Sequence, residues 1–446
     1  MTPWQFTDQI CRRLRDAGYQ AFLVGGCVRD FLLGREPADF DVATDAAPDR
    51  VQQLFPNSIA VGAQFGVILV VEDSLEVEVA TFRSDVGYSD GRHPDRVVYS
   101  RSAEEDVLRR DFTINGLLLD PQTGQVLDYV GGREDLRARV VRAIGEPARR
   151  FQEDKLRMAR AVRFAARLGY TIEPQTFAAI RRVAAQITQV SAERLRDELT
   201  KLLTEGAPRR GFELLEEIAL LEVVLPEVAR MKGVEQPPMF HPEGDVWIHT
   251  RLMLEKLPAS CSPTLAWGVL LHDVGKPPTF TPAAGPDGRI RFDHHVEVGA
   301  RMAEEICRRL RFSNDDTEQI ISLVAQHLRF KDVFDMRAST LKRFVRLPRF
   351  DEHLELHRLD CLASHGNLEA YEFVRRFLEQ TPPEQVRPSR LVTGEDLKEL
   401  GFSPGPQFRE ILQAVEDAQL DGRLASRDQA LEFIRRNYAA GQNRPR

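Results

Sequence analysis

The sequence predicts an α+β protein in which a mixed α/β domain at the N-terminus precedes a longer, helical part. Within residues 1 to 145, short apolar runs alternate with clusters of Gly, Pro and Asp, as is typical of a sheet with connecting helices and turns. From Glu153 onward the pattern becomes helical, and Pro and Gly are confined to a few breaks. The 446 residues are enough for roughly two to four domains, each with its own core.

The strands of the N-terminal domain are expected at its short apolar runs, which are Phe22 to Val24, Val67 to Val71, Val77 to Ala80, Leu117 to Leu119 and Val140 to Ile144. A further strand is expected over Ala38 to Thr44, and a helix-compatible run extends from Gly26 to Leu33. The segment Arg83 to Arg101 is rich in Ser, Asp, Gly and Pro, which predicts a long mobile loop. Loops of that length are often functional.

Breaks divide the helical part. A linker rich in Pro and Gly, Gly233 to Gly244, precedes helices from Trp247 to Leu378, and a break at Thr381 to Pro388 introduces a last helical piece, Gly394 to Arg436. These breaks predict four domains: a head, a neck, a body and a tail. Their expected bounds are 1–145, 146–232, 245–380 and 385–446.

Composition limits the classes of protein that fit. Hydrophobic residues make up 42% and charged residues 29%, as in ordinary soluble proteins. No apolar stretch approaches the ~18 residues of a membrane helix, and the polar N-terminus lacks a signal-peptide core, so we expect a cytoplasmic protein without membrane contact. The five cysteines are scattered, without C-x-x-C spacing, which predicts reduced thiols.

The run Leu23-Val24-Gly25-Gly26-Cys27-Val28-Arg29-Asp30 is the first candidate for a functional site. An apolar strand ends there in two glycines, and a helix-compatible run follows. Glycines let the backbone turn sharply and lie close to a phosphate, which the N-terminus of a helix also attracts. The pattern therefore indicates a phosphate-binding turn.

Asp39 and Asp41 form the second candidate. On one strand, residues two apart share a face, so both carboxylates would point into one space. Two such carboxylates suit Mg²⁺, which can clamp the attacking oxygen and the phosphates in an in-line displacement. Glu78 is a candidate third carboxylate, and an exposed strand position is the equal alternative. Together with the glycine turn, the aspartates predict a nucleotidyl-transfer site.

The net charge of −7 argues against a general nucleic-acid binder, so contact with nucleic acid must be local. Basic residues outnumber acidic ones between Arg142 and Arg167, and a solvated helix face would explain that excess equally well.

Six motifs, taken in order, resemble those of bacterial tRNA nucleotidyltransferases, specifically the CCA-adding enzymes of the class shared with bacterial poly(A) polymerases. These motifs are LVGGCVRD, ADFDVATDAAPD, EVATFRSD, EEDVLRRDFTINGL, FQEDKLRMARAVRFAARLGY and LVTGEDLKELGFSPGPQF. The resemblance covers nearly the whole chain. It implies a head similar to that of DNA polymerase beta, with a helical neck, body and tail that hold the acceptor arm of tRNA. It also implies addition of C, C and A to the tRNA 3′ end without a nucleic-acid template, from CTP and ATP with Mg²⁺.

The resemblance also assigns roles to residues of the head. Asp39 and Asp41 are the implied metal ligands, and Gly26 and Arg29 would contact the phosphates of the incoming nucleotide. In the R-R-D motif, Arg110 would contact the nucleotide and Asp111 would help couple the head to the neck, so both count among the catalytic residues. The structural alternative for Arg29 is a surface ion pair with Asp30. For the R-R-D motif, it is an ion-pair cluster of Arg109, Arg110 and Asp111 at the end of an element.

A protein template for base choice is expected at Asp154 and Arg157, which would be side by side on a helix. Cytosine and adenine both present an amine donor next to a ring-nitrogen acceptor. A carboxylate accepts from the amine and a guanidinium donates to the ring nitrogen, whereas uracil and guanine reverse that polarity. The family pattern adds Arg160 and Arg163 as nucleotide contacts. The structural alternative is a salt bridge on a helix surface.

A second constellation lies in the helical half and resembles the HD phosphohydrolase pattern. Its six candidate metal ligands are His249, His272, Asp273, His295, His327 and Asp360. His294, beside His295, leaves the third position ambiguous. Mixed nitrogen and oxygen ligands favour a divalent transition metal over Mg²⁺, and such metals activate water for phosphoester hydrolysis. HD modules fused to nucleotidyltransferases can be structural remnants, or can hydrolyse 2′,3′-cyclic phosphates and 2′-phosphates.

Several alternatives to full CCA addition remain open. Poly(A) polymerase is disfavoured because the stretch Val61 to Val67 lacks the usual cations and the chain is acidic. Addition of A alone is not excluded, whereas addition of CC alone conflicts with the presence of the Arg83 to Arg101 segment. Intact Asp39, Asp41, Asp154 and Arg157 argue against an HD phosphohydrolase with an inactive head. A non-catalytic tRNA-binding or assembly protein would need neither set of carboxylates.

Overall fold

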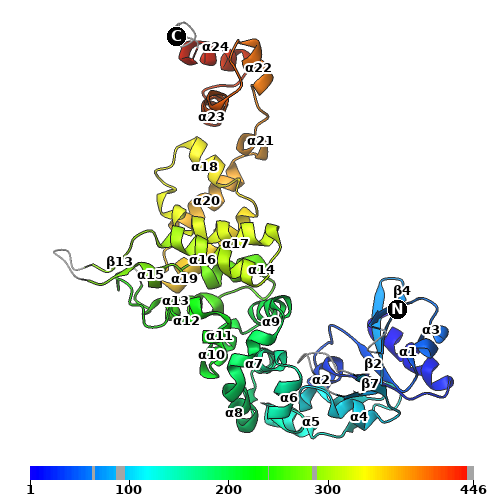
Figure 1. Cartoon of the computed structure of the whole chain (residues 1–446). Coiled ribbons are helices and arrows are strands. Elements are labelled where there is room, and N and C mark those ends of the chain that lie inside the picture. Colours follow the sequence, from blue (N-terminus) through cyan, green and yellow to red (C-terminus); the bar gives the residue numbers. More distant parts are fainter. Residues whose placement is uncertain (63–65, 87–95, 240, 284–288, 439–446) are drawn as a thin grey trace. The chain divides into compact units, whose positions relative to one another are not determined.

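The computed structural model describes the chain except residues 63–65, 87–95, 240, 284–288 and 439–446, which are left out below. It consists of two compact units, one of residues 1–230 and 308–312 and the other of residues 231–307 and 313–446 (Figure 1). A mixed sheet with flanking helices occupies the first part of the chain and helices the rest, so the predicted α+β class is confirmed. The four predicted domain bounds stay predictions.

The sheet of the head has seven strands in the order β3-β4-β5-β2-β1-β8-β9. Its strands are β1 (Ala21–Val24), β2 (Asp41–Thr44), β3 (Ser58–Gly62), β4 (Val67–Glu72), β5 (Leu75–Thr81), β8 (Leu117–Leu119) and β9 (Val126–Asp128). Strands β2 and β5 are parallel, and the other neighbours pair antiparallel. Apolar side chains that point away from solvent on these strands form the core, which includes Val24, Ala43 and Leu118.

The helices of the head are α1 (Pro3–Asp16), α2 (Gly26–Leu32), α3 (Pro48–Leu54), α4 (Ala103–Leu108) and α5 (Gly132–Ala138), with a 3-10 turn η2 (Thr113–Asn115). Helices α1 and α3 contact each other and the sheet, while α2 contacts β1, β8 and η2. The expected loop from Arg83 to Arg101 is wrong at both of its ends, which pair as the antiparallel strands β6 (Arg83–Val86) and β7 (Arg96–Tyr99). The adjacent β-branched residues Val97 and Val98 favour that pairing. The middle of the segment lies outside the described residues.

The neck follows in the same unit. Its elements are α6 (Pro147–Glu153), α7 (Leu156–Leu168), α8 (Pro174–Val183), η3 (Ala184–Gln189), α9 (Ala192–Thr204), α10 (Pro208–Glu217), α11 (Leu221–Val224) and α12 (Pro226–Ala229), with the short parallel pair β10 (Val140–Val141) and β11 (Thr171–Ile172). Helix α7 packs against both α9 and α10. Its buried residues, such as Met158, Val162 and Ala165, recur three to four positions apart, which is why it forms an amphipathic helix here.

The second unit is helical. Its elements are α13 (Val246–Glu255), α14 (Pro263–Leu271), α15 (Lys276–Thr279), the pair β12 (Phe280–Thr281) and β13 (Arg291–Phe292), α16 (His295–Arg309), α17 (Asn314–Gln326), η4 (His327–Asp332), α18 (Ala338–Phe344), α19 (Phe350–Ala363), α20 (Glu369–Gln380), α21 (Pro383–Val386), α22 (Gly394–Glu399), α23 (Pro406–Leu420) and α24 (Arg427–Tyr438). Helix α14 is buried along its whole length and packs against α13, α17 and α19.

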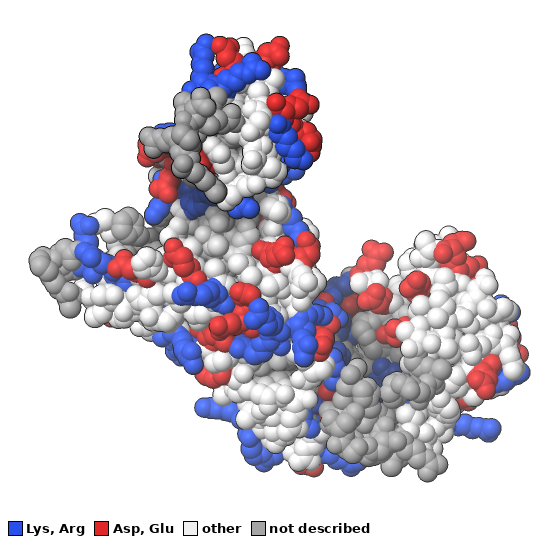
Figure 2. All heavy atoms as spheres, turned by 45° about the horizontal axis from the view of Figure 1, so that its top comes forward, with Lys and Arg blue, Asp and Glu red and all other residues white. Residues whose placement is uncertain are grey.

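The composition sets expectations for the charges on the surface and for the hydropathy of the helices. On the face shown in Figure 2, basic and acidic side chains are interspersed over the described surface. Among the described helices, none combines the length and the apolar content needed to cross a bilayer.

Candidate functional site

The glycine turn of the head lies against the aspartate strand. Strand β1 ends at Val24, which pairs with Asp41 on β2, and Gly25 then turns the chain into α2 with φ of 79°. A Cβ atom at Gly25 would lie 3.7 Å from Nη1 of Arg110 and 3.9 Å from Oδ2 of Asp41. The positive φ favours glycine here, and the contacts place Arg110 and Asp41 beside the turn.

Three carboxylates influence one another at this point. Glu78 on β5 is the register partner of Asp41 on β2. Burial and the Glu78 charge raise the pKa of Asp41 to about 6; Arg110 lowers it in part, and Asp39 raises it further. Repulsion of this kind at Asp41 is relieved when a divalent cation binds, which suits Asp41 as a metal ligand. Glu78 is exposed on its strand, and the oxygens of the three carboxylates do not all lie within 4.8 Å of one another in this structure.

One detail of the prediction is wrong. Strand β2 begins at Asp41, so Asp39 lies before the strand and does not alternate along it with Asp41. Asp39 still raises the pKa of Asp41, although less than burial and Glu78 do.

Gly26 and Arg29 lie on the first turn of α2. Arg29 is 3% exposed and its guanidinium donates from Nε and Nη2 to Asp30 and from Nη1 to Oδ1 of Asn115, at 2.8 to 3.0 Å. In this structure Arg29 therefore forms the ion pair with Asp30 that was the structural alternative. To bind a phosphate, its guanidinium must release Asp30 or Asn115. Gly26 leaves room beside Nη2 of Arg29, 3.7 Å from an added Cβ.

The R-R-D motif forms two ion pairs at the end of α4. Arg109 and Arg110 both donate to the buried Asp106, with Nη2 to oxygen distances of 2.7 and 3.0 Å. Asp111 instead accepts from Nε and Nη2 of Arg160 in the neck, at 2.9 and 2.7 Å. Burial alone would raise the pKa of Asp111, but Arg160 outweighs it and the pKa falls to about 2. Asp111 therefore joins the sheet domain to α7.

Asp111→Asn is expected to destabilise the first unit by roughly 1 to 2 kcal/mol at neutral pH, allowing for solvent screening at Arg160. The folded pKa, about 2, lies below the ordinary value of 3.8, so this stabilisation is present above about pH 4 and is lost as the pH falls through 2. Urea unfolding of both proteins at pH 7, 4 and 3 measures the difference. A gap that stays constant over this range would contradict the charge-based explanation.

Asp154 and Arg157 do not form a pair on one helix, so that part of the prediction is wrong. Helix α6 ends at Glu153 and α7 begins at Leu156, and Asp154 between them has extended backbone. Its Oδ1 accepts from the backbone N–H of Leu156, as aspartates at helix starts do. Arg194 on α9 donates to both oxygens of Asp154, at 2.8 and 3.3 Å.

Arg157 has other partners. Its Nη1 lies 3.0 Å from Oε2 of Glu153, and its Nη2 donates to the carbonyl of Arg109 at 3.0 Å. The guanidinium thus bridges the neck and the R-R-D motif, and the surface salt-bridge alternative for Asp154 with Arg157 is wrong as well.

Arg160 and Arg163 surround Phe164. Their Cζ atoms lie 5.2 and 4.5 Å from the ring centroid, and that of Arg29 lies 5.4 Å from it. Arg163 is 6% exposed and donates to Glu198 on α9, as well as to Glu205. A nucleotide role for Arg163 stays a prediction, and its observed contacts join α7 to α9.

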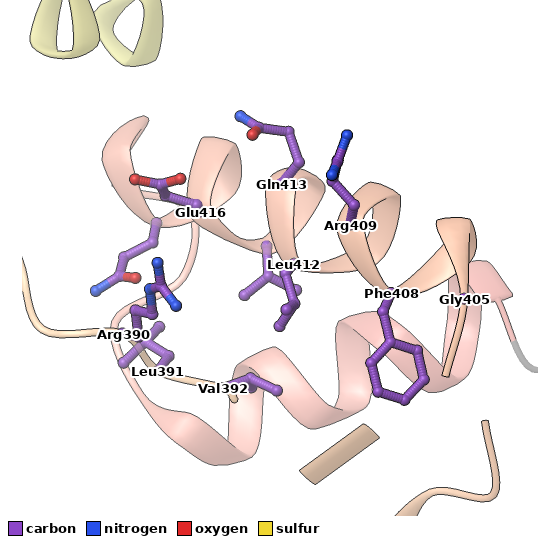
Figure 3. A pocket seen from close by; sticks show the side chains of 11 residues that line it. Arg390, Leu391, Val392, Gly405, Phe408, Arg409, Leu412, Gln413 and Glu416 are labelled. Atoms are coloured by element: carbon purple, nitrogen blue, oxygen red, sulfur yellow. The ribbon is translucent and has the colours of Figure 1, made fainter. Parts of the chain in front are cut away.

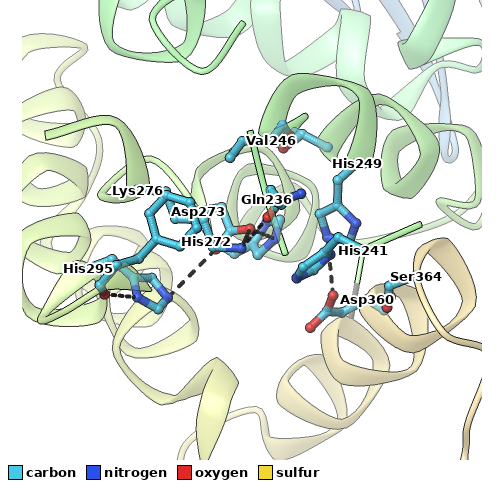
Figure 4. Close-up of polar contacts among 12 residues, drawn as sticks. Gln236, His241, Val246, His249, His272, Asp273, Lys276, His295, Asp360 and Ser364 are labelled. Atoms are coloured by element: carbon cyan, nitrogen blue, oxygen red, sulfur yellow. Dashed lines mark hydrogen bonds and ion pairs between the residues drawn. The ribbon is translucent and has the colours of Figure 1, made fainter. Parts of the chain in front are cut away.

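The six candidate ligands of the HD pattern are gathered in the second unit (Figure 4). They form two adjacent groups whose ligand atoms lie within 4.8 Å of one another, which are His249, His272 and Asp360, and Asp273, His295 and His327. His272 Nε2 lies 3.1 Å from Oδ2 of Asp273, which connects the groups. His295 is the member of the cluster, whereas the side chain of His294 is 82% exposed.

Three of these imidazoles are oriented by backbone carbonyls. Nδ1 of His272, of His295 and of His327 each lies 2.8 Å from the carbonyl oxygen three residues earlier. A carbonyl only accepts, so Nδ1 carries the hydrogen and Nε2 presents a lone pair. Burial lowers the pKa of His327 to about 4. It also lowers the pKa of His295 below its ordinary value, so both rings stay neutral at neutral pH.

Buried ligand atoms in this cluster lack hydrogen-bond partners in the described structure. They include Nε2 of His249, His272 and His295 and Oδ1 of Asp273. Nε2 of His249 and of His272 each lie 3.1 Å from a carboxylate oxygen, of Asp360 and Asp273 respectively. Such orphaned atoms are costly unless something binds them, so the donor set fits a divalent transition metal.

Sequence reasoning missed two members of this cluster, His241 and Glu243. Oε1 of Glu243 lies 2.7 Å from Nδ1 of His249 and 2.9 Å from Nδ1 of His241. Carboxylates that orient ligand histidines in this way are typical of metal sites. Both residues lie in the Pro- and Gly-rich linker, and the His-x-Glu spacing just before α13 was the available signal. Arg194 was missed too, because nothing local relates it to Asp154.

A cavity of about 630 Å³ opens next to the cluster. It is lined by His295, His327 and Asp360 of the cluster, by Lys276 and Lys331, and by Phe292 and Phe334. Nζ of Lys276 lies 2.6 Å from Oδ2 of Asp273. Basic and aromatic side chains around the ligands would suit a phosphorylated, nucleotide-sized molecule.

The tail carries a smaller pocket of about 400 Å³ between α23 and the segment before α22 (Figure 3). Its walls are apolar, with Leu391, Val392, Phe408 and Leu412, and Arg390 and Arg409 stand beside them.

Comparison with known proteins agrees with this organisation. Three family profiles match, described as "Poly A polymerase head domain" over residues 21–142, "Probable RNA and SrmB- binding site of polymerase A" over 169–232, and "HD domain" over 245–348. Fold and site together define a nucleotidyltransferase with a helical RNA-binding region and an HD domain.

The particular family follows from full-length relatives. The CCA-adding enzyme of Levilactobacillus brevis is 31% identical over 96% of this chain and 96% of its own length, and that of Geobacillus sp. strain WCH70 is 31% identical over 99% of each. The crystal structure of the Bacillus stearothermophilus CCA-adding enzyme in complex with CTP covers 100% of both chains with a TM-score of 0.76 at 27% identity. The Thermotoga maritima CCA-adding enzyme complexed with tRNA has a TM-score of 0.58 at 18% identity over 96% of this chain and 94% of its own, which shows the fold alone. The chain belongs to the family of CCA-adding enzymes.

Proposed function

We propose that this protein adds C, C and A in turn to the 3′ end of tRNA, using CTP and ATP. The observation that carries the proposal is the head site, in which Asp41 is in register with Glu78 and lies beside Arg110 and the Gly25 turn. The full-length relatives named CCA-adding enzymes support the same activity.

Asp39 and Asp41 would hold Mg²⁺ in the head, with Glu78 as a third carboxylate. A divalent cation bound there would supply charge stabilisation for the in-line attack of the tRNA 3′ hydroxyl on the α-phosphate. The chain's own part is positioning. Arg110 is held by Asp106 at the edge of the glycine turn, where a triphosphate can approach the backbone and the guanidinium.

Base choice would rest on Asp154 and Arg157. The carboxylate accepts from the amine of C or A, and the guanidinium donates to the ring nitrogen, whereas U and G present the opposite polarity. Both side chains have other partners in this structure, so Arg157 must leave Glu153 when a base arrives. The contact of Arg157 with the Arg109 carbonyl keeps it near the head site.

Asp154→Ala is expected to reduce the preference for CTP over UTP by about 10- to 100-fold, since a good bidentate base contact contributes ~1 to 3 kcal/mol of discrimination. The measurement is kcat/KM for each nucleotide with tRNA that lacks CCA. Retained exclusion of UTP and GTP in both Asp154→Ala and Arg157→Ala would disprove the protein template.

The activity itself is tested with three tRNAs that lack CCA, end in C, or end in CC, each incubated with one labelled nucleotide. Extension of all three to CCA and no further is expected. Long A tails would instead indicate a poly(A) polymerase, and extension of the CC-ended tRNA alone would indicate an A-adding enzyme. The cytoplasmic location predicted from the sequence stays a prediction.

We also propose a second activity, phosphoester hydrolysis at the HD cluster. The specific observation that favours it is the set of unsatisfied, buried Nε2 atoms that face Asp273 and Asp360, next to a cavity with basic side chains. The six predicted ligands would hold a divalent transition metal, which supplies activated water when bound. Glu243 would orient His249, and Lys276 and Lys331 would attract the phosphate. The expected substrates are 2′,3′-cyclic phosphates and 2′-phosphates.

The tRNA would be held by the neck, the body and the tail. In the tail, Arg390 and Arg409 flank the apolar pocket, an arrangement suited to a phosphate and an unstacked base.

A further inference from the structure

The direction of the Asp154 carboxylate is set by two contacts. Because Asp154 lies between α6 and α7, no helical neighbour fixes its side chain. Nη2 of Arg194 donates to Oδ2 at 2.8 Å and Nη1 donates to Oδ1 at 3.3 Å, while the N–H of Leu156 donates to Oδ1 at 3.1 Å. Asp154 and Arg194 are 17% and 24% exposed in their side chains, so water competes with this pairing only in part.

Helix α9 carries Arg194 in its first turn and is joined to α7 by ion pairs. Glu198, one turn after Arg194, accepts from Arg163 at 2.5 Å. At the other end, Glu205 accepts from Arg163 and Arg167 at 3.0 and 3.1 Å. Since the middle and the C-terminal end of α9 are tied to α7, Arg194 is held in place against the segment that contains Asp154.

The count of acceptor sites has a chemical consequence. A carboxylate offers about four lone-pair positions, two on each oxygen. Arg194 and Leu156 together occupy both positions of Oδ1 and one of Oδ2. One acceptor remains, on Oδ2, and a single acceptor is what the exocyclic amine of cytosine or adenine requires.

We propose that Arg194 is a positioning residue for base selection, which orients Asp154 so that its remaining acceptor meets the base amine. This inference rests on the proposed function and extends it to a residue outside the EDKLR motif. Without Arg194 only the N–H of Leu156 holds the carboxylate, through Oδ1, so Oδ2 is free to turn and the register between its acceptor and the Arg157 donor is lost.

The test compares Arg194→Ala, Arg194→Lys and Lys201→Ala. Lys201 is an exposed residue two turns later on α9, so its replacement removes the same charge from the same helix without touching Asp154. Steady-state kcat/KM is measured for CTP and UTP with tRNA that lacks CCA, together with the melting temperature of each variant.

Arg194→Ala is expected to lower the CTP to UTP ratio of kcat/KM about tenfold, mainly through a higher KM for CTP. Arg194→Lys, which keeps one donor, should recover part of the ratio, and Lys201→Ala should leave it unchanged. If Arg194 had only a structural role, its loss would lower kcat/KM for CTP and UTP by the same factor and would lower the melting temperature. An unchanged ratio in Arg194→Ala, or the same loss in Lys201→Ala, overturns the inference. If the unsubstituted enzyme adds neither nucleotide, the proposed function fails first and this inference with it.

Discussion

Asp41→Asn is expected to abolish nucleotide addition, with kcat lowered at least about a thousandfold, which corresponds to roughly 4 kcal/mol of lost transition-state stabilisation. Asp41 is the central carboxylate of the head site, because it is in register with Glu78 and responds to Asp39 and Arg110. An amide keeps the shape of the side chain but removes the charge that a divalent cation requires. Incorporation of labelled CMP into tRNA that lacks CCA measures the loss.

Asp73→Asn is the matched control for that substitution. This substitution makes the same change of side chain, from Asp to Asn, at an exposed residue of the β4–β5 turn. The φ of Asp73, 55°, is one that asparagine adopts readily. Activity of Asp73→Asn should equal that of the unsubstituted protein. tRNA binding by Asp41→Asn, measured by filter retention, should change little. Turnover within tenfold of normal in Asp41→Asn would show that the metal is held elsewhere.

The glycine turn beside the aspartate strand was largely predictable because its signals are local, while the roles of these residues stay predictions. A strand that ends in Gly25 and Gly26 can turn in few ways, and Asp41 follows at a spacing that returns the chain to the same sheet edge. Glu78 could only be a candidate. Its place beside Asp41 depends on the parallel pairing of β5 with β2, and sheet order is set by packing of the whole domain.

In the segment from Glu153 to Arg157, helical periodicity predicted the wrong backbone conformation. A helical pattern through Glu153 and Leu156 suggests one helix, but Asp154 has extended backbone at the end of α6, and its Oδ1 accepts from the N–H of Leu156 at the start of α7. The partner of its carboxylate is Arg194, from a helix whose position follows from tertiary packing. Spacing alone therefore could not predict the contacts of Asp154 and Arg157, and their part in base choice stays a prediction.

The HD cluster was predictable for a different reason. Its ligands come from separate helices, so spacing could not bring them together, and the order of His249, His272-Asp273, His295 and His327 was informative only by resemblance. Glu243 is absent from that pattern. Its role appears only when α13 places His249 beside the linker.

His295→Asn is expected to lower the affinity of the body for a divalent transition metal at least about tenfold, and Asp273→Asn to lower it further. Nε2 of His295 and of His327 lie 3.9 and 3.8 Å from Oδ1 of Asp273, so this carboxylate faces both rings as well as His272. Loss of Asp273 therefore leaves several neutral donors without their anionic partner. Metal content after dialysis against Mn²⁺ or Ni²⁺ measures the affinity, and release of phosphate from a 2′,3′-cyclic nucleotide with added phosphatase measures hydrolysis.

His294→Asn is the matched control because it makes the same change at the adjacent residue, whose side chain is exposed and whose φ of 61° asparagine tolerates. It should keep both metal and hydrolysis. All three variants should still add CCA to tRNA, since the head site shares no residue with the cluster. Equal metal content in His295→Asn and His294→Asn would refute the ligand assignment. Metal loss without any hydrolysis in the unsubstituted protein would instead leave a structural metal site, in which the unsatisfied Nε2 atoms serve the stability of the helical body alone.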